Sequence, residues 1–256
     1  MLILLSPAKK LNFQKNAINF ISSVPFFLEE AKLLAETASH LNPSELSKLM
    51  KISPKLANLN YDRFQKFSEN PDPEKLKQAA FTFNGDTYLG LDSDSVDQVN
   101  HEFMQNHLRI LSGLYGVLKP FDLIQPYRLE MGSRLSNSQG GNLYAYWGEK
   151  ISDSLKNELE DHKHKILINL ASEEYFKVLK NGVSASQVVT PKFYEKRNGQ
   201  IKIISFLAKK ARGLMARFII DNNITNPKEL ENFQSSGYSF QKSKSDSENL
   251  IFLREQ

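Results

Sequence analysis

Residues 205–221 read SFLAKKARGLMARFIID, a stretch in which apolar residues recur at helical spacing. At about 3.6 residues per turn, the basic residues fall on the arc opposite the apolar stripe. Gly213 and Ala216 lie among the charges on that arc. The pattern predicts an amphipathic helix whose positive face has no bulky side chain at its centre. The apolar stripe consists of Ala211, Leu214, Met215, Phe218 and Ile219, and the basic arc of Lys209, Lys210, Arg212 and Arg217.

The basic arc of this helix has two possible meanings. A solvated helix face is the common one, but two features favour an anion site. A glycine inside a helix costs about 1 kcal/mol relative to alanine, so Gly213 suggests that another backbone, such as that of a polyanion, comes close. Residues 192–217 also carry eight basic residues and one acidic residue, a net charge of +7, whereas the whole chain has +4.

The composition is that of a soluble globular protein of 256 residues. A chain without cysteine cannot form disulfides, thiolate nucleophiles or cysteine-based metal sites. The first residues, 1–7, have no basic region before a short apolar run, and no later stretch reaches the roughly 20 apolar residues that span a bilayer. We therefore expect a cytoplasmic monomer with no membrane contact, no bound metal and no cofactor.

A continuous apolar run at residues 2–5 and the mostly apolar segments 108–111 and 165–170 predict buried strands. The segment 187–207, with Asn198-Gly199 at its turn, predicts a β-hairpin that leads into the basic helix. Between these strands the periodicity predicts helices over residues 25–40, 95–106 and 143–160. The alternation predicts a mixed α/β (α+β) fold, a mixed sheet flanked by helices, in one domain over residues 1–256.

Residues 43–60 resemble a helix-hairpin-helix, an element whose hairpin points backbone amides at a phosphate. The usual hairpin has two glycines, and here Lys51 and Ser53 stand in their places. The N-terminus of the second helix still offers free amides, and Lys51 and Lys55 add positive charge. The alternative is a pair of helices that only pack against the rest of the chain.

Candidate cleft residues follow strand ends and glycine-rich turns. Ser6 and Lys9, with Lys10 beyond them, follow the first strand, and Glu174 follows the strand at 165–170, a position where α/β proteins often place reactive groups. Arg128 and Glu130 either line a cleft or form an ion pair that holds their loop. The sequence has no His-Glu-x-x-His, Gly-x-Ser-x-Gly or phosphate-loop motif, so no nucleophile and base can be paired.

Several of these segments together resemble the YaaA peroxide-stress family. They are LLSPAKKL at residues 4–11, FNGDTYLGL at 83–91, LSGLYGVLKP at 111–120, QPYRLEMG at 125–132, INLAS at 168–172 and IISFLAKKARGLMARF at 203–218. The resemblance covers nearly the whole chain. It implies a bacterial cytoplasmic protein made under peroxide stress, with an α/β fold of unusual topology, a helix-hairpin-helix and a basic cleft that binds DNA. It also implies a role in limiting DNA damage by iron and peroxide, and it supplies no catalytic residues.

Three functions remain open at this point. The first is DNA binding, duplex or structured, through phosphates and with weak sequence preference. The second is an enzyme that acts on a base or nucleotide in a cleft lined by Ser6, Lys9, Arg128, Glu130 and Glu174. The third is iron sequestration, for which Asp92, Asp94 and Asp97 form the densest carboxylate run. The predicted DNA contacts are Lys10, Lys51, Ser53, Lys55, Lys209, Lys210, Arg212, Gly213 and Arg217.

Overall fold

The computed structural model describes residues 1–14 and 21–255. Its strands are β1 (Leu2–Leu5), β2 (Lys77–Gln78), β3 (Leu108–Ser112), β4 (Gly116–Leu118), β5 (Leu123–Ile124), β6 (Leu167–Asn169), β7 (Val188–Arg197), β8 (Gln200–Lys202), β9 (Tyr238–Phe240) and β10 (Asn249–Glu255). An eight-stranded sheet has the order β4-β3-β1-β6-β7-β10-β9, with β8 paired to β7, and β2 pairs with β5 in a separate ribbon. In the sheet, each neighbouring pair along the path β3-β1-β6-β7-β10 is parallel, whereas β4, β8 and β9 are antiparallel to their partners.

The central strands are buried throughout. Every residue of β1, β3 and β6 is buried, as expected for parallel strands that are covered on both faces. The predicted strands at residues 2–5, 108–111 and 165–170, the hairpin at 187–207 and the mixed α/β class are therefore confirmed. Because β1 and β6 are adjacent and parallel, the segments that leave their carboxyl ends lie side by side.

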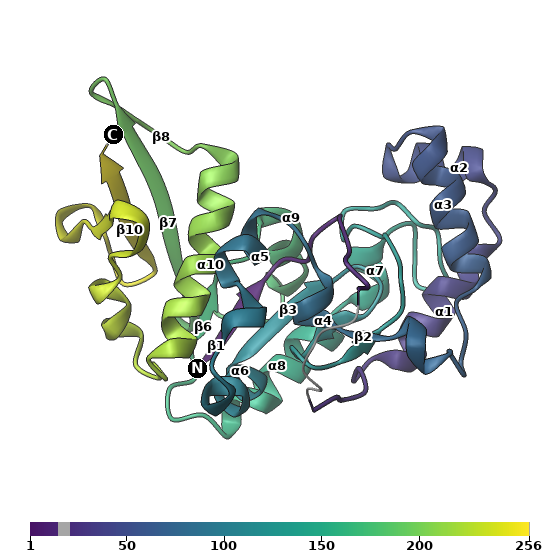
Figure 1. Ribbon diagram of the computed structural model, residues 1–256, viewed down its shortest axis with the longest axis horizontal. Coiled ribbons are helices and arrows are strands. Elements are labelled where there is room, and N and C mark those ends of the chain that lie inside the picture. Colours follow the sequence, from purple (N-terminus) through teal and green to yellow (C-terminus); the bar gives the residue numbers. More distant parts are fainter. Residues whose placement is uncertain (15–20, 256) are drawn as a thin grey trace.

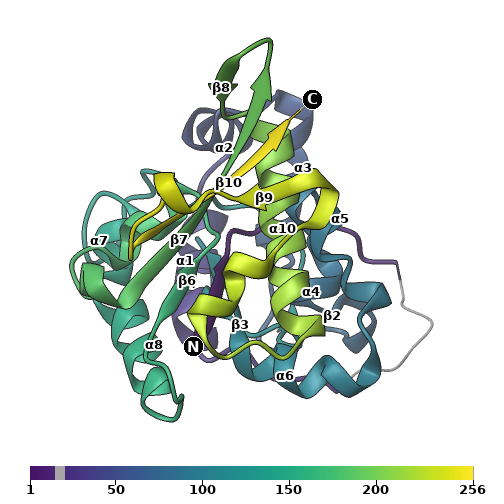
Figure 2. The ribbon, with the colours of Figure 1, turned by 90° about the vertical axis from the view of Figure 1, so that its left-hand side faces the viewer.

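The helices are α1 (Leu28–Ser39), α2 (Pro43–Met50), α3 (Pro54–Gln65), α4 (Ala79–Thr82), α5 (Asp86–Leu91), α6 (His101–His107), α7 (Leu143–Trp147), α8 (Lys150–Glu160), α9 (Glu173–Phe176) and α10 (Ser205–Asp221). Figure 1 shows α10 with β7 and β10 at one end of the long axis and α1, α2 and α3 at the other. The view in Figure 2 agrees, since α2 and α3 lie behind α10 there. In Figure 1 both ends rise above the middle of the molecule.

The basic helix is covered on more sides than its sequence pattern predicts. Of the predicted stripe, Ala211, Met215 and Ile219 are buried, and Leu214 and Phe218 are partly buried against the core. Buried residues outside that stripe include Ala208, Ala216 and Ile220. The positive face is therefore narrower than the predicted arc.

The small-residue gap of α10 is filled by α5. Gly213 is buried, and a Cβ atom there would lie 1.8 Å from the carbonyl oxygen of Thr87. Gly90 of α5 meets α10 in the same way, because its Cβ atom would lie 2.1 Å from the carbonyl oxygen of Lys210. The two glycines let the helix backbones touch. The prediction that Gly213 leaves room for a polyanion is wrong, since a helix of the same chain occupies that room.

The two helices predicted within residues 43–60 are confirmed as α2 and α3. Asn42 and Glu45 form a capping box at the start of α2, and Lys51 ends it in a left-handed conformation with φ of 52°. The Ser53 hydroxyl accepts a hydrogen bond from the backbone N–H of Leu56 and caps α3. The two helices are joined by a turn without glycine, and both the helix-hairpin-helix and its contact with DNA stay predictions.

Two predicted helices differ from the structure. The segment 95–106 begins as two short 3₁₀ turns, Ser93–Ser95 and Gln98–Asn100, and becomes α-helical only at α6. The segment 143–160 is broken between α7 and α8 at Gly148, whose φ of 49° an α-helix does not allow. None of the helices in the described part of the chain is long and apolar enough to cross a membrane.

Candidate functional site

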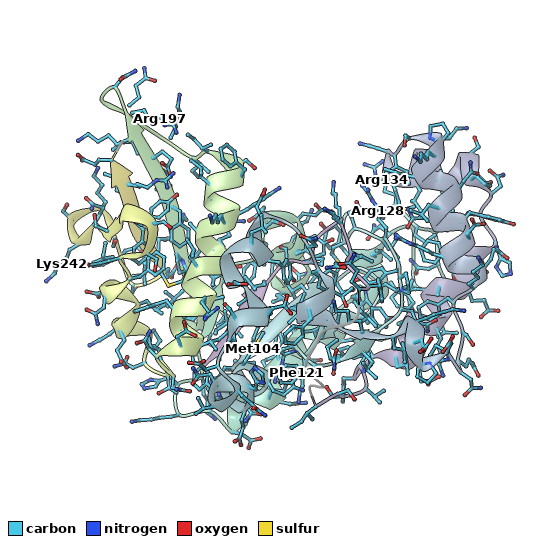
Figure 3. All side chains as sticks on the ribbon, in the orientation of Figure 1. Met104, Phe121, Arg128, Arg134, Arg197 and Lys242 are labelled. Atoms are coloured by element: carbon cyan, nitrogen blue, oxygen red, sulfur yellow. The ribbon has the colours of Figure 1, made fainter. Side chains whose placement is uncertain are left out.

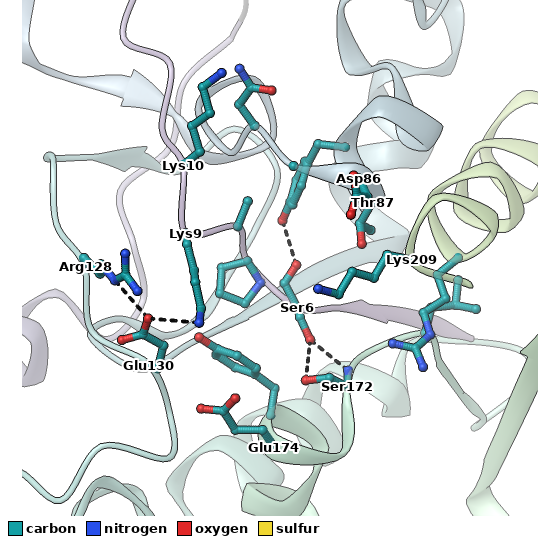
Figure 4. Close-up of a pocket in the computed structure, with 18 of the residues that line it drawn as sticks. Ser6, Lys9, Lys10, Asp86, Thr87, Arg128, Glu130, Ser172, Glu174 and Lys209 are labelled. Atoms are coloured by element: carbon teal, nitrogen blue, oxygen red, sulfur yellow. Dashed lines mark hydrogen bonds and ion pairs between the residues drawn. The ribbon is translucent and has the colours of Figure 1, made fainter. Parts of the chain in front are cut away.

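A cavity of about 450 Å³ opens where the loop after β1, the start of α5, the segment 127–130, the turn after β6 and the first half of α10 meet (Figure 4). Its volume lies in the range typical of small-molecule sites. All five residues that the sequence marks as cleft candidates line it: Ser6, Lys9, Arg128, Glu130 and Glu174. Lys10, Lys209 and Arg212, three of the predicted DNA contacts, line it as well.

The floor of the cavity is fixed by hydrogen bonds between strand ends. Ser6 Oγ accepts the backbone N–H of Ser172 at 2.8 Å and donates to Ser172 Oγ at 3.3 Å. The phenol of Tyr88 donates to the carbonyl oxygen of Ser6 at 3.1 Å. Because the Ser6 proton is directed at Ser172 and no base is bonded to Ser6 within the described residues, these contacts position the loop and do not activate a nucleophile.

One side of the cavity carries the carboxylates. Glu130 Oε1 accepts a hydrogen bond from Arg128 Nε at 2.9 Å and lies 3.8 Å from Lys9 Nζ. Glu130 Oε2 is buried and has no hydrogen-bond partner within the described residues. Glu174 is more exposed, and its Oε1 accepts the backbone N–H of Gly132 at 3.0 Å. The ion pair predicted between Arg128 and Glu130 is therefore present, and it lines the cleft as well.

Tyrosine rings lie around these carboxylates. Tyr127 and Tyr175 are buried and line the cavity. Burial raises the pKa of both phenols, and the nearby Glu130 carboxylate raises it further. Both phenols therefore stay neutral in the physiological range and present aromatic, uncharged surface to the cavity. Neither tyrosine belongs to a motif in the sequence, and only their positions beside Arg128 and Glu174 indicate a place in the cavity.

The other side of the cavity is basic. Figure 4 shows Lys209 extending from α10 toward Ser6, on the side away from Glu130. Arg212, one turn further along α10, is half-buried, and this burial lowers the pKa of its guanidinium. Within the described residues neither Lys209 nor Arg212 forms an ion pair. A guanidinium that is partly removed from water without a carboxylate partner is costly unless an anion joins it.

The remaining predicted contacts lie outside the cavity. Arg217 bonds the Asp221 carboxylate at 2.7 Å, Ser95 Oγ at 2.7 Å and the carbonyl oxygen of Asp92 at 3.0 Å, so it holds α10 to the turn after α5. This use within the chain argues against the predicted role of Arg217 in DNA contact. Lys210 is exposed on α10 but does not line the cavity.

The predicted contacts of the helical hairpin, Lys51, Ser53 and Lys55, are exposed at the opposite end of the molecule (Figure 1). Arg63 of α3 does not line the cavity. Burial lowers the pKa of its guanidinium, and the positive charge of Arg128 lowers it further. Figure 3 labels Arg128 and Arg134 between the two raised ends. No sequence pattern indicates Arg63, because the environment of its guanidinium depends on the packing of α3.

Residues 1–14 and 21–255 contain no group of three His, Asp or Glu side chains that could hold a metal ion. Asp92, the first residue of the carboxylate run considered for iron, accepts a hydrogen bond from Ser95 Oγ through Oδ2 at 2.5 Å and has φ of 47°. The iron alternative therefore has no supporting cluster among the described residues.

The fold and the site define a mixed α/β protein with a cavity that is acidic on one side and basic on the other. Residues 1–244 match the family described as peroxide stress protein YaaA. The chain is 48% identical to a UPF0246 protein from Alteromonas mediterranea and 48% identical to one from Aliivibrio fischeri, covering 100% of this chain and 99% of each relative. A UPF0246 protein from Colwellia psychrerythraea is 47% identical over the full length of both chains. The chain belongs to the YaaA family of peroxide stress proteins.

Proposed function

We propose that this protein binds DNA during the peroxide-stress response and holds its phosphates on the basic side of the cavity. The observation that carries the proposal is Arg212, a half-buried guanidinium that lines the cavity and has no ion-pair partner in the described part of the chain. Lys209 extends into the same space. A phosphate would supply the missing counter-charge, and the planar guanidinium can bond it in bidentate fashion.

The distribution of charge supports a polymer as the ligand. Residues 192–217 carry a net charge of +7, and Lys51 and Lys55 add exposed charge at the opposite end of the molecule. Arg128 and Arg134 lie between the two ends (Figure 3). A strand that runs from one end to the other would meet Lys51 and Lys55, then the basic side of the cavity, and would pass the carboxylates of Glu130 and Glu174 on the other side. Because these contacts go to phosphates, binding would depend little on sequence and would weaken steeply with salt.

Such binding offers a physical route to protection in a stress response. A protein that covers the backbone and neutralises its phosphates displaces the cations that collect along DNA. Iron ions are among the cations that this displacement would remove from the neighbourhood of the bases. The protein would in this way limit DNA damage by iron and peroxide.

The proposal is tested with the double variant Lys209→Ala/Arg212→Ala on two duplexes of unrelated sequence. Each lost charge-assisted contact is worth about 1.5–3 kcal/mol, so the loss of two should lower affinity about 100-fold or more for both duplexes alike. The matched control is Lys242→Ala/Lys244→Ala, which removes two exposed lysines, of which Figure 3 labels Lys242 at the outer edge of the molecule. Unchanged binding by the double variant contradicts the proposal, as does an equal loss in the control.

A second candidate function is an enzyme that acts on a nucleic-acid base or nucleotide in the same cavity. It is favoured by the convergence of Ser6, Lys9, Arg128, Glu130 and Glu174 on one space. Repair enzymes that act on bases extrude the target into such a pocket. Assays for base release and strand nicking on a panel of damaged duplexes test it, with Glu130→Gln as the variant expected to lose turnover. No turnover by the unaltered protein on the whole panel leaves binding as the function.

A further inference from the structure

We infer that the cavity binds one unpaired nucleotide, whose phosphate lies against Lys209 and Arg212 and whose base donates an amino N–H to Glu130 Oε2. This inference rests on the proposed binding of nucleic acid and names the chemical unit that the site takes. The same unit can come from two sources, a free nucleoside 5′-monophosphate or a nucleotide that is unpaired within a DNA strand.

Among the described residues, one carboxylate oxygen of Glu130 has no hydrogen-bond donor. Glu130 Oε1 is occupied by Arg128 and faces Lys9, whereas Oε2 is buried and lacks a donor within the described residues. A buried acceptor that is left unsatisfied costs about 1–3 kcal/mol, and more when it is charged. Glu130 lines the cavity, so a ligand toward which its carboxylate turns can bring the missing donor. A base amino group is such a donor, and carboxylates accept from cytosine N4 in known base recognition.

The walls of the cavity are partly aromatic and apolar. They include the buried tyrosines Tyr88, Tyr127 and Tyr175 and the buried Leu129. Aromatic and aliphatic walls suit the flat π-face of a base, and stacking on an aromatic side chain is worth about 1–3 kcal/mol per base. A phosphate or a sugar alone would gain nothing from this surface.

The two ends of the cavity differ in charge. Glu130 and Lys209 lie on opposite sides of Ser6 in Figure 4, and Arg212 is on the same helix as Lys209. A ligand that satisfies both ends must carry an N–H donor at one end and an anion at the other, with a flat apolar body between them. A nucleotide has this arrangement. In a duplex the amino group is already paired, so the nucleotide must be unpaired or extruded to reach Glu130.

The test uses two ligands that differ only in the amino group, dAMP and 2′-deoxyribosylpurine 5′-monophosphate, which lacks the 6-amino group. Isothermal titration calorimetry on the unaltered protein should show dAMP binding about 10- to 100-fold more tightly, the value of a hydrogen bond to a charged group. A second arm places the same two nucleotides as a single bulge in a DNA duplex. Preference for the amino compound in the bulge alone identifies DNA as the source, and preference in both arms identifies the nucleotide itself.

The variant Glu130→Gln keeps the shape of the side chain and removes its charge. Because a charge-assisted hydrogen bond is roughly twice as strong as a neutral one, the preference for the amino compound should fall to about its square root. Arg212→Ala should weaken both ligands and leave the preference unchanged. Equal binding of the two ligands by the unaltered protein, or binding of neither in either arm, overturns the inference. A fully paired duplex measured beside them shows separately whether the proposed DNA binding holds.

Discussion

Replacing Gly213 by alanine tests the packing of α10 on α5, which forms one wall of the cavity. The added Cβ atom would lie 1.8 Å from the carbonyl oxygen of Thr87 and 2.7 Å from the backbone nitrogen of Leu91. Cβ atoms essentially never come closer than 3.0 Å to such atoms, so α5 must move away by about 1.2 Å, the difference between 3.0 Å and 1.8 Å. Overpacking of this kind costs about 1–3 kcal/mol, and alanine returns about 1 kcal/mol in helix propensity.

The net loss expected for Gly213→Ala is therefore up to about 2 kcal/mol in the free energy of unfolding. For a chain of this size, 1 kcal/mol corresponds to roughly 2–4 °C in Tm, so scanning calorimetry should show a decrease of up to about 8 °C. The control is Gly141→Ala, since a Cβ atom at Gly141 meets no other group within 4 Å. Its Tm should match that of the unaltered protein. A Tm for Gly213→Ala above that of the control contradicts the contact between the helices.

Two further predictions concern buried polar groups around β3. Arg109 is 3% exposed and pairs with Glu158, so Arg109→Ala leaves that carboxylate without its main partner and should lower the free energy of unfolding by about 3–5 kcal/mol, as measured by urea denaturation. A loss below 1 kcal/mol would show that the pair does not matter. Burial, aided by the charges of the Met1 amine and His107, lowers the pKa of His162 to about 4, so the unfolded chain binds the extra proton first and stability should fall as the pH drops from about 6.5 to 4. In His162→Gln the decrease in Tm between pH 7 and pH 5 should be smaller, and an identical decrease contradicts this assignment.

The central fold could be predicted because its signals are local. Residues 2–5 are a continuous apolar run, and residues 108–112 and 167–169 are mostly apolar, because β1, β3 and β6 are covered on both faces; the Asn198-Gly199 turn marks the hairpin. The break at Gly148 was missed, because the helical periodicity continues through it and only the backbone conformation reveals it.

The contact between α5 and α10 could not be predicted from the pattern of either segment. Gly213 carries a signal for close approach, but the sequence does not say which backbone approaches. The partner is Thr87 of α5, more than a hundred residues earlier in the chain. A glycine inside a helix thus indicates that another backbone comes close, but it does not identify that backbone.

The part of the site that follows the ends of strands could be predicted from the sequence. Ser6 and Glu174 were singled out because they follow strands, and the parallel pairing of β1 with β6 brings those ends together. The sequence does not show which polar groups find a hydrogen-bond or ion-pair partner after folding. Among the described residues, Oε2 of Glu130 has no hydrogen-bond partner and the guanidinium of Arg212 has no ion-pair partner; both are properties of the packed chain, and they carry the proposals made for the cavity.

The salt dependence of DNA binding measures directly whether Lys209 and Arg212 hold phosphates. Fluorescence anisotropy with one duplex at several salt concentrations gives the slope of log affinity against log salt, which reports the number of neutralised phosphates. For Lys209→Ala/Arg212→Ala the slope should shrink by about 2, close to one for each lost phosphate contact, while Lys242→Ala/Lys244→Ala keeps the slope of the unaltered protein. A slope that is the same in both double variants and in the unaltered protein would contradict phosphate binding at this cavity.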